Sequence, residues 1–284
     1  MPALIIHGGA GRPRPRKMRD EIARSLERIS AQLWTLIEAG NAALDVAVEA
    51  AVLLEDDPLF NAGTGSKLQR DGAARLSAAL MNGEDARFSG VVNIEGILNP
   101  IRLCAHLQQE RDRVLSGQGA LERAQALGLQ EGDVRTQAAI DTWKRAIEGE
   151  TGTIGAVVLD QRGQLAASTS TGGRGMEGRG RVSDSCTVAG NYATPHAGVS
   201  CTGIGEDIVD GALAVRLVTA VEGGVPIKQA AAKLEQQMQT NGWKAGLIGM
   251  DAQGQWAAIE TTEIMYWYAI DSGGHHRFTD PDER

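Results

Sequence analysis

Residues Thr151 to Gly173 read TGTIGAVVLDQRGQLAASTSTGG. Residues 154–159 form an apolar, β-branched run, and DQRG at 160–163 is typical of a tight turn between two strands. Leu165 to Ser170 would then return as the second strand. A polar, glycine-containing EGETG precedes this hairpin at 148–152. The stretch therefore predicts a hairpin that begins at Thr153, directly behind a flexible segment.

The same pattern recurs near the C-terminus as residues 247–250, a DAQG turn at 251–254 and residues 256–259. We interpret the two as hairpins of one sheet rather than as an internal duplication. Further strands are expected at 3–6, 74–81 and 88–97, and helices at 18–39, 42–54, 100–128, 207–221 and 227–239. Hairpins grouped around helical pairs predict an antiparallel α+β layered fold. Residues 129–152 are polar and aperiodic, so we expect an exposed, mobile linker there.

Composition excludes several classes of protein. The net charge of the 284 residues is −8 and no basic stripe appears beyond residues 12–19, so nucleic acid is not an expected partner. The three cysteines show no CxxC spacing, which argues against a disulfide framework or a zinc site and suits a reducing cytoplasm. No stretch approaches 18 apolar residues, and the N-terminal apolar run is too short for a signal peptide. We therefore expect a soluble, cytoplasmic protein without a membrane partner.

Thr153 is the first residue that points to chemistry. A threonine hydroxyl is a poor nucleophile unless a base lies beside it. If the chain were cut after Gly152, Thr153 would carry its own base, because an α-amine has a pKa of about 7.7 to 8.0. Glycine at 152 would allow the strained backbone that such a cut requires. Thr151 is a rival nucleophile, but it would not begin the strand. Thr153 also has a plain structural reading as one more β-branched strand residue.

Two further segments could complete a site. Arg181 suits a substrate carboxylate and Asp184 suits an ammonium group, so the pair could bind an amino-acid head group; they could equally be two surface charges that pair with each other. Thr202 and Gly203 end an apolar strand before a helix, where a hydroxyl and backbone N–H groups could form an oxyanion hole. An ordinary helix start would look much the same.

Taken together, six blocks resemble a known family. They are HGGAG (7–11), PLFNAGTG (58–65), GTIGAV (152–157), TSTGG (169–173), GRVSDS (180–185) and CTGIGE (201–206). Their order and spacing resemble the plant-type asparaginase, or isoaspartyl peptidase, family of N-terminal nucleophile hydrolases. The resemblance covers nearly the whole chain and is least close at 84–150 and after 260.

The resemblance implies a single αββα-sandwich domain, residues 1–284, made as one precursor. It would cut itself between Gly152 and Thr153 into an α subunit (1–152) and a β subunit (153–284), and two such αβ pairs would form a homodimer. The residues implied for the site are Thr153 as nucleophile, Thr171 to orient it, Arg181 and Asp184 for the α-carboxylate and α-amine, Thr202 and Gly203 for the oxyanion, Gly205 in the pocket wall and Asn61 as support.

The implied reaction is hydrolysis of the side-chain amide of L-asparagine or of β-aspartyl dipeptides, with release of aspartate and without a catalytic cofactor. The loop at 54–64 matches one that binds a structural sodium ion, which suits all-oxygen ligands. The ligands implied are the main-chain carbonyls of Leu54, Glu55, Asp57, Phe60, Ala62 and Thr64.

The chain departs from the family pattern at a few places. Ser77 stands in a Leu-Ser-Ala run where Leu-Asp-Ala is usual, Asn82 where aspartate is common, and Ser183 replaces a usual glycine. Residues 244–246 and 260–268 also diverge, so we expect an effect on substrate preference.

Three other functions are alternatives to this interpretation. A nucleotide-binding protein lacks support, because HGGAG and TGGRGMEGRG do not have the spacing of phosphate-binding loops. An uncleaved relative could bind a small molecule without catalysis. The same chemistry could also act on glycosylated asparagine or on proteins after aspartate; the TSTGG block and the short linker favour small substrates.

Overall fold

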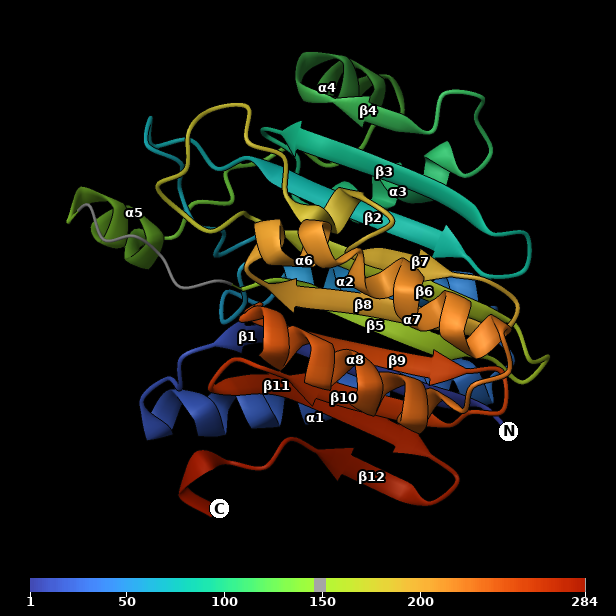
Figure 1. Ribbon diagram of the computed structural model, residues 1–284. Coiled ribbons are helices and arrows are strands. Elements are labelled where there is room, and N and C mark those ends of the chain that lie inside the picture. The colour runs from blue at the N-terminus through green and yellow to red at the C-terminus, as the bar shows by residue number, and fades with distance from the viewer. Residues whose placement is uncertain (146–151, 284) are drawn as a thin grey trace.

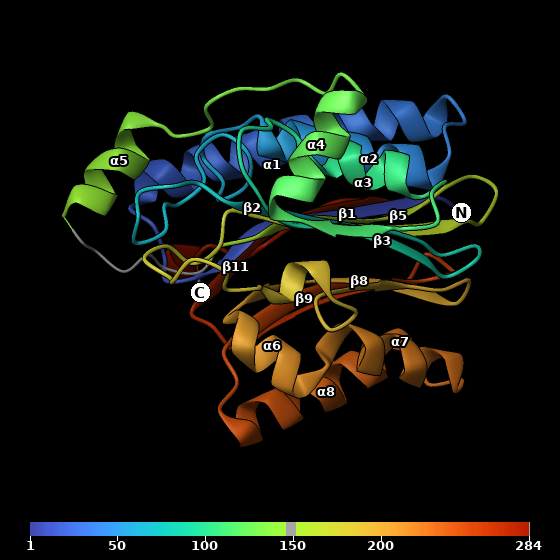
Figure 2. The same ribbon diagram turned by 90° about the horizontal axis from the view of Figure 1, so that it is seen from above.

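The computed structural model describes residues 1–145 and 152–283. Two sheets pack face to face, and helices cover the outer face of each (Figures 1 and 2). This is the αββα arrangement that the sequence predicted, so the α+β fold class is confirmed.

The larger sheet has the strand order β12-β11-β1-β5-β6-β2-β3-β4. Its strands are β1 (Ala3–Gly11), β2 (Leu76–Asn82), β3 (Arg87–Ile94), β4 (Val114–Ser116), β5 (Ile154–Leu159), β6 (Leu165–Thr171), β11 (Ile264–Asp271) and β12 (Gly274–Arg277). The smaller sheet has the order β10-β9-β8-β7. It consists of β7 (Asn191–Ala193), β8 (Ala197–Gly203), β9 (Ala245–Asp251) and β10 (Trp256–Glu260). Neighbouring strands are antiparallel, apart from the parallel pair β3 and β4.

The helices divide between the two outer faces (Figure 2). The larger sheet is covered by α1 (Arg16–Glu38), α2 (Ala43–Glu55), α3 (Pro100–Leu107) and α4 (Gly117–Ala126), and α5 (Gln137–Lys144) projects beyond its end. The smaller sheet is covered by α6 (Gly205–Gly211), α7 (Leu213–Glu222) and α8 (Ile227–Asn241). Short 3₁₀ turns occur at Asp184–Cys186 and Pro281–Glu283.

The central strand β5 is apolar on both faces because both of its faces are buried. On β5, Ile154, Ala156 and Val158 pack under α1 and α2, whereas Val157 and Leu159 pack between the sheets against residues such as Met250. A third cluster joins β8 and β9 to α7 and α8. The continuous apolar run of the opening stretch is thus the signature of a strand enclosed from two sides.

Four sequence-based expectations need correction. The two similar hairpins lie in different, facing sheets, since β5–β6 belongs to the larger sheet and β9–β10 to the smaller. The helix expected at 100–128 is interrupted by β4, and the one at 207–221 is interrupted at Ala212, which has a φ of 47°.

The fourth correction concerns the expected linker. Residues 129–145 are not an open linker: they contain α5, whose first turn is capped by the Thr136 side chain, and a bridge between Ile97 and Glu131. The apolar face of α5 is short: Ala139, Ile140 and Trp143 are only partly buried against the core, so the signal in the sequence is weak. The remaining linker residues, 146–151, lie outside the described part of the chain, and so does Thr151, the rival nucleophile.

One glycine shows how closely the sheets approach behind Thr153. A Cβ on Gly155 would lie 2.0 Å from Ser200 Oγ and 2.6 Å from His7 Nε2. Those two side chains are hydrogen-bonded to each other at 3.0 Å, and the Ser200 hydroxyl also lies 2.6 Å from the Thr169 hydroxyl. Burial lowers the pKa of His7 to about 3, so the imidazole is neutral in this network.

We expect Gly155→Ala to lower the free energy of unfolding by about 1 to 3 kcal/mol, because the added methyl group must displace two buried polar side chains. Urea unfolding followed by circular dichroism measures it. The matched control is Gly119→Ala in α4, where an added Cβ meets no atom within 4 Å and which should stabilise the protein slightly. Equal stability of the two variants would contradict the close approach described here.

Candidate active site

The hairpin register brings two threonines together. Ile154 pairs with Ser170, so Thr153, one residue before β5, lies beside Thr171 at the end of β6. The Thr153 hydroxyl donates to the Thr171 hydroxyl across 3.3 Å, and both residues are buried. The predicted nucleophile and the residue expected to orient it are therefore neighbours in the central pair of strands.

The carbonyl group of Gly152 accepts two hydrogen bonds. The Asn61 amide Nδ2 donates to it at 2.6 Å, and the Thr171 hydroxyl donates at 3.1 Å. The same Nδ2 donates to the Gly173 carbonyl at 2.5 Å, while Asn61 Oδ1 accepts the Lys67 N–H at 2.9 Å. Two donors on one carbonyl oxygen polarise the bond between Gly152 and Thr153 and would stabilise negative charge on that oxygen.

Arg181 and Asp184 converge near this bond, but they do not pair in the way the alternative interpretation expected. Arg181 instead donates from Nε and Nη2 to the two carboxylate oxygens of Glu206, each at 3.0 Å. Asp184 is buried, and its Oδ2 has no hydrogen-bond partner among the described residues. Burial raises the pKa of Asp184 to about 7, although the Arg181 charge opposes the shift. Arg181 is thus held by Glu206, and no described cation forms an ion pair with Asp184.

Gly205 is required for this convergence. A Cβ at this position would lie 2.7 Å from Asp184 Oδ1 and 2.8 Å from Arg181 Nη2. A Cβ on Gly190 would lie 2.6 Å from Asp184 Oδ2. Two glycines therefore leave the space in which one cationic and one anionic side chain meet, which is the arrangement that an amino-acid head group needs.

The two residues expected to form an oxyanion hole are placed differently. Gly203 ends β8 with a φ of 130° and borders the cavity at Thr153. Thr202 is fully buried, and its hydroxyl accepts the Ala10 N–H at 3.2 Å. Thr202 does not line the cavity in the intact chain.

These residues enclose one small cavity. It is lined by Gly152, Thr153, Thr171, Gly173, Arg174, Arg181, Ser183, Asp184, Gly203 and Gly205. The space open to the centres of water molecules is about 10 Å³, roughly enough for one water molecule. With Gly152 forming one wall, the uncut chain has no room for an aspartyl group.

Two residues at the site, Arg174 and Glu206, were not among the predicted site residues. An arginine directly after TSTGG and the glutamate that ends CTGIGE were the signals available in the sequence.

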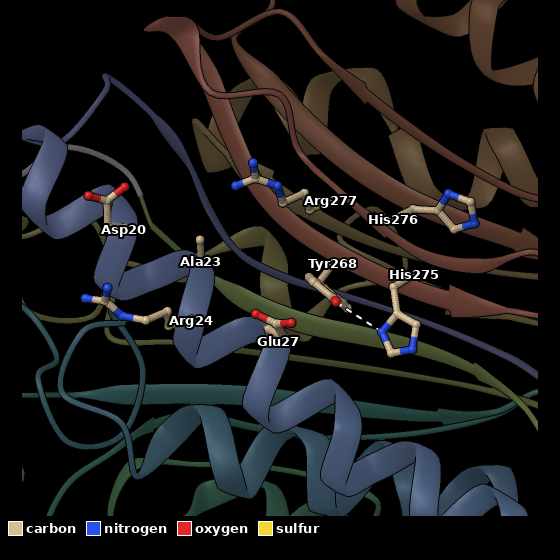
Figure 3. A pocket seen from close by; sticks show the side chains of 8 residues that line it. All are labelled: Asp20, Ala23, Arg24, Glu27, Tyr268, His275, His276 and Arg277. Carbon is tan, nitrogen blue, oxygen red and sulfur yellow. Dashed lines mark hydrogen bonds between the residues drawn. The ribbon is translucent and has the colours of Figure 1, made fainter. Parts of the chain in front are cut away.

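A larger cavity lies elsewhere. About 460 Å³ are open between α1 and the strands β11 and β12, bordered by Asp20, Arg24, Glu27 and others (Figure 3). There the Tyr268 hydroxyl and His275 Nδ1 are 3.1 Å apart. Its lining contains no serine, threonine or cysteine, so it lacks the chemistry of the Thr153 cavity despite its size. His275 and His276 belong to β12.

The loop expected to bind sodium supplies main-chain oxygens. The Glu55 carbonyl accepts the Thr64 N–H at 2.7 Å, and the Asp57 carbonyl accepts the Phe60 N–H at 3.1 Å, so the loop curls back on itself. Within residues 1–145 and 152–283, no three His, Cys, Asp or Glu side chains gather as a metal site. None of the helices in that part of the chain is long and apolar enough to cross a membrane.

Two facing sheets, each covered by helices, with a threonine at the start of a central strand, are the arrangement of the N-terminal nucleophile hydrolase fold. The profile of the asparaginase family matches residues 1–279, and the chain belongs to this family. It is 42% identical to the isoaspartyl peptidase/L-asparaginase of Synechocystis sp. over 93% of this chain and 86% of that protein. It is 33% identical to the human isoaspartyl peptidase/L-asparaginase, over 99% and 97% of the two chains. It is 34% identical to the plant-type L-asparaginase of Thermococcus kodakarensis, over 96% and 97%. The family prediction, and with it that of a hydrolytic enzyme, is confirmed.

Proposed function

We propose that this protein is a self-cleaving threonine hydrolase that releases L-aspartate from L-asparagine and from β-aspartyl dipeptides. The observation that carries the proposal is the Gly152 carbonyl, which accepts hydrogen bonds from Asn61 and Thr171 beside the Thr153 hydroxyl. Relatives with both activities in their names share up to 42% of their residues with this chain over most of its length.

Self-cleavage would run through an ester. The Thr153 hydroxyl oxygen adds to the Gly152 carbonyl carbon, and Asn61 and Thr171 stabilise the oxyanion. The peptide bond then breaks, the Thr153 nitrogen takes up the hydroxyl proton, and Gly152 remains as an ester on the Thr153 side chain. Water hydrolyses this ester. The products are a Gly152 carboxylate and a Thr153 that carries both a free hydroxyl and an α-amine.

The mature enzyme would repeat this chemistry on a substrate. Arg181 binds the α-carboxylate and Asp184 the α-ammonium group, which places the side-chain carbonyl carbon at the Thr153 hydroxyl. The α-amine of Thr153 accepts the hydroxyl proton and passes it to the leaving nitrogen. Ammonia or an amino acid departs, and the aspartyl ester is hydrolysed by water that the same amine activates. Gly203 and, after cleavage, Thr202 would stabilise the oxyanion, while Gly205 keeps the head-group site open.

The further expectations from sequence belong to the same proposal. We infer a homodimer of αβ pairs in the cytoplasm, where the three free, buried cysteines stay reduced. A sodium ion held by the carbonyls of residues 54–64 would stiffen the loop that carries Asn61 and would take no part in the chemistry. The small volume of the cavity in the uncut chain weighs against an uncleaved protein that binds its ligand at Thr153.

Denaturing gels and intact masses of freshly purified protein, taken over several days, test the proposal. The 30.0 kDa chain should yield bands of about 16 and 14 kDa, in proportion to 152 and 132 residues. The smaller band should begin at Thr153, and Thr153→Ala should remain whole. Asparaginase activity should rise with the fraction cleaved. A chain that stays whole, or is cut without Thr153, would refute the proposal.

A further inference from the structure

Arg174 borders the candidate active-site cavity, and the proposed reaction gives it no role. It follows Gly173 directly, is exposed, and makes no hydrogen bond or ion pair with another described residue. Its charge acts on Glu206, whose pKa it helps to lower, while Glu206 itself is held by two hydrogen bonds from Arg181. Arg174 therefore has a positive charge available at the edge of the cavity.

The walls of the cavity decide where a leaving group can lie. Its lining includes Thr153 and Thr171, then Arg181 and Asp184, which would bind the head group. Gly152, Gly173 and Arg174 line the same cavity and have no part in binding that head group. Gly152 and Gly173 are neighbours, since one Asn61 amide nitrogen donates to both of their carbonyls. Cleavage frees Gly152 from Thr153, so the space that opens there is bordered by Arg174.

We propose that Arg174 binds the free carboxylate of the amino acid that leaves from a β-aspartyl dipeptide, and that it thereby favours dipeptides over asparagine. This inference rests on the proposed function. In such a dipeptide the carboxylate carbon is two bonds from the leaving nitrogen, so the carboxylate stays close to the cavity that Arg174 borders. The planar guanidinium matches a carboxylate with two parallel hydrogen bonds. Ammonia, the leaving group of asparagine, offers nothing for Arg174 to bind.

The test compares three substrates on fully cleaved enzyme. They are a β-aspartyl dipeptide with a free C-terminal carboxylate, the same dipeptide as its C-terminal amide, and L-asparagine. For Arg174→Gln we expect kcat/KM on the free dipeptide to fall about three- to tenfold, the range for a hydrogen-bonded ion pair that is partly exposed to water. The values for the amide and for asparagine should change less than twofold. Arg174→Glu should make the amide the better dipeptide substrate.

The matched control is Arg179→Gln. Arg179 is an exposed arginine of the same loop, but it lines a separate cavity of about 470 Å³. It should leave all three values unchanged. An unaltered ratio of the two dipeptides in Arg174→Gln would overturn the inference. So would an equal loss on all three substrates, which would show that Arg174 only holds the site in shape. Cleaved wild-type enzyme that hydrolyses none of the three would instead refute the proposed function, and this inference with it.

Discussion

Asn61→Asp should leave the chain uncut for days under conditions in which the wild type cleaves. At neutral pH an aspartate offers only acceptors, so an oxygen would replace the Nδ2 that now donates to the carbonyls of Gly152 and Gly173. Removal of one oxyanion donor lowers rates by about 10² to 10³-fold, and here a repulsive contact is added. The measurement is the fraction of cleaved chain against time on denaturing gels.

Asn82→Asp is the matched control for this prediction. It makes the same chemical change at the end of β2, where the Asn82 side chain accepts the Glu84 N–H and makes no other hydrogen bond with a described residue. It should cleave at the wild-type rate. Thermal melting of Asn61→Asp would establish that the variant is folded. If a folded Asn61→Asp cleaves as fast as the wild type, Asn61 does not activate the Gly152 carbonyl.

The sequence was sufficient to predict the parts of the site that depend on local pattern. The hairpin at 154–170 was read from its turn and its β-branched strands, and its register alone brings Thr153 to Thr171. The convergence of Arg181 and Asp184 on that hairpin was not a local property. It was predicted only because six ordered blocks resembled a family whose site was known.

Other features depended on contacts that no local pattern encodes. The hairpins β5–β6 and β9–β10 look alike in sequence, and only long-range packing places them in different sheets. The helix α5 has only eight residues and a short, partly buried apolar face, which gives a weak helical period in the sequence. The ion pair of Arg181 with Glu206 joins residues 25 positions apart, and no local pattern in the sequence encodes it.

Ligand affinity should depend on pH through Asp184, which must be ionised to bind an ammonium group. Burial raises the pKa of Asp184 to about 7, with Glu206 adding to the shift and Arg181 opposing it. Aspartate affinity should therefore fall as the pH drops from 8 to 6. Succinate lacks the α-amine. It should bind more tightly as the pH falls from 8 to 6, because protonation of Asp184 removes an unpaired buried charge. Calorimetric titration of both ligands measures this without interference from the Thr153 amine in catalysis. Parallel pH profiles would contradict the role of Asp184.

Asp184→Asn separates binding from stability. Aspartate affinity should fall by on the order of 10² to 10³-fold, as expected when one partner of a buried charge pair is removed, and its pH dependence should vanish. Self-cleavage should persist, because no hydrogen bond joins Asp184 to Gly152 in the described structure.

The same variant should also change the stability of the fold. A carboxyl whose folded pKa is raised from 3.8 to about 7 stabilises the fold below pH 4, and this contribution is lost as the pH rises through 7. At pH 8 the variant should therefore be more stable than the wild type by up to about 4 kcal/mol. Urea unfolding at pH 5 and pH 8 measures the gain, which should shrink at the lower pH. An Asp184→Asn variant that is less stable than the wild type at pH 8 would show that the buried Asp184 carboxylate does not destabilise the fold.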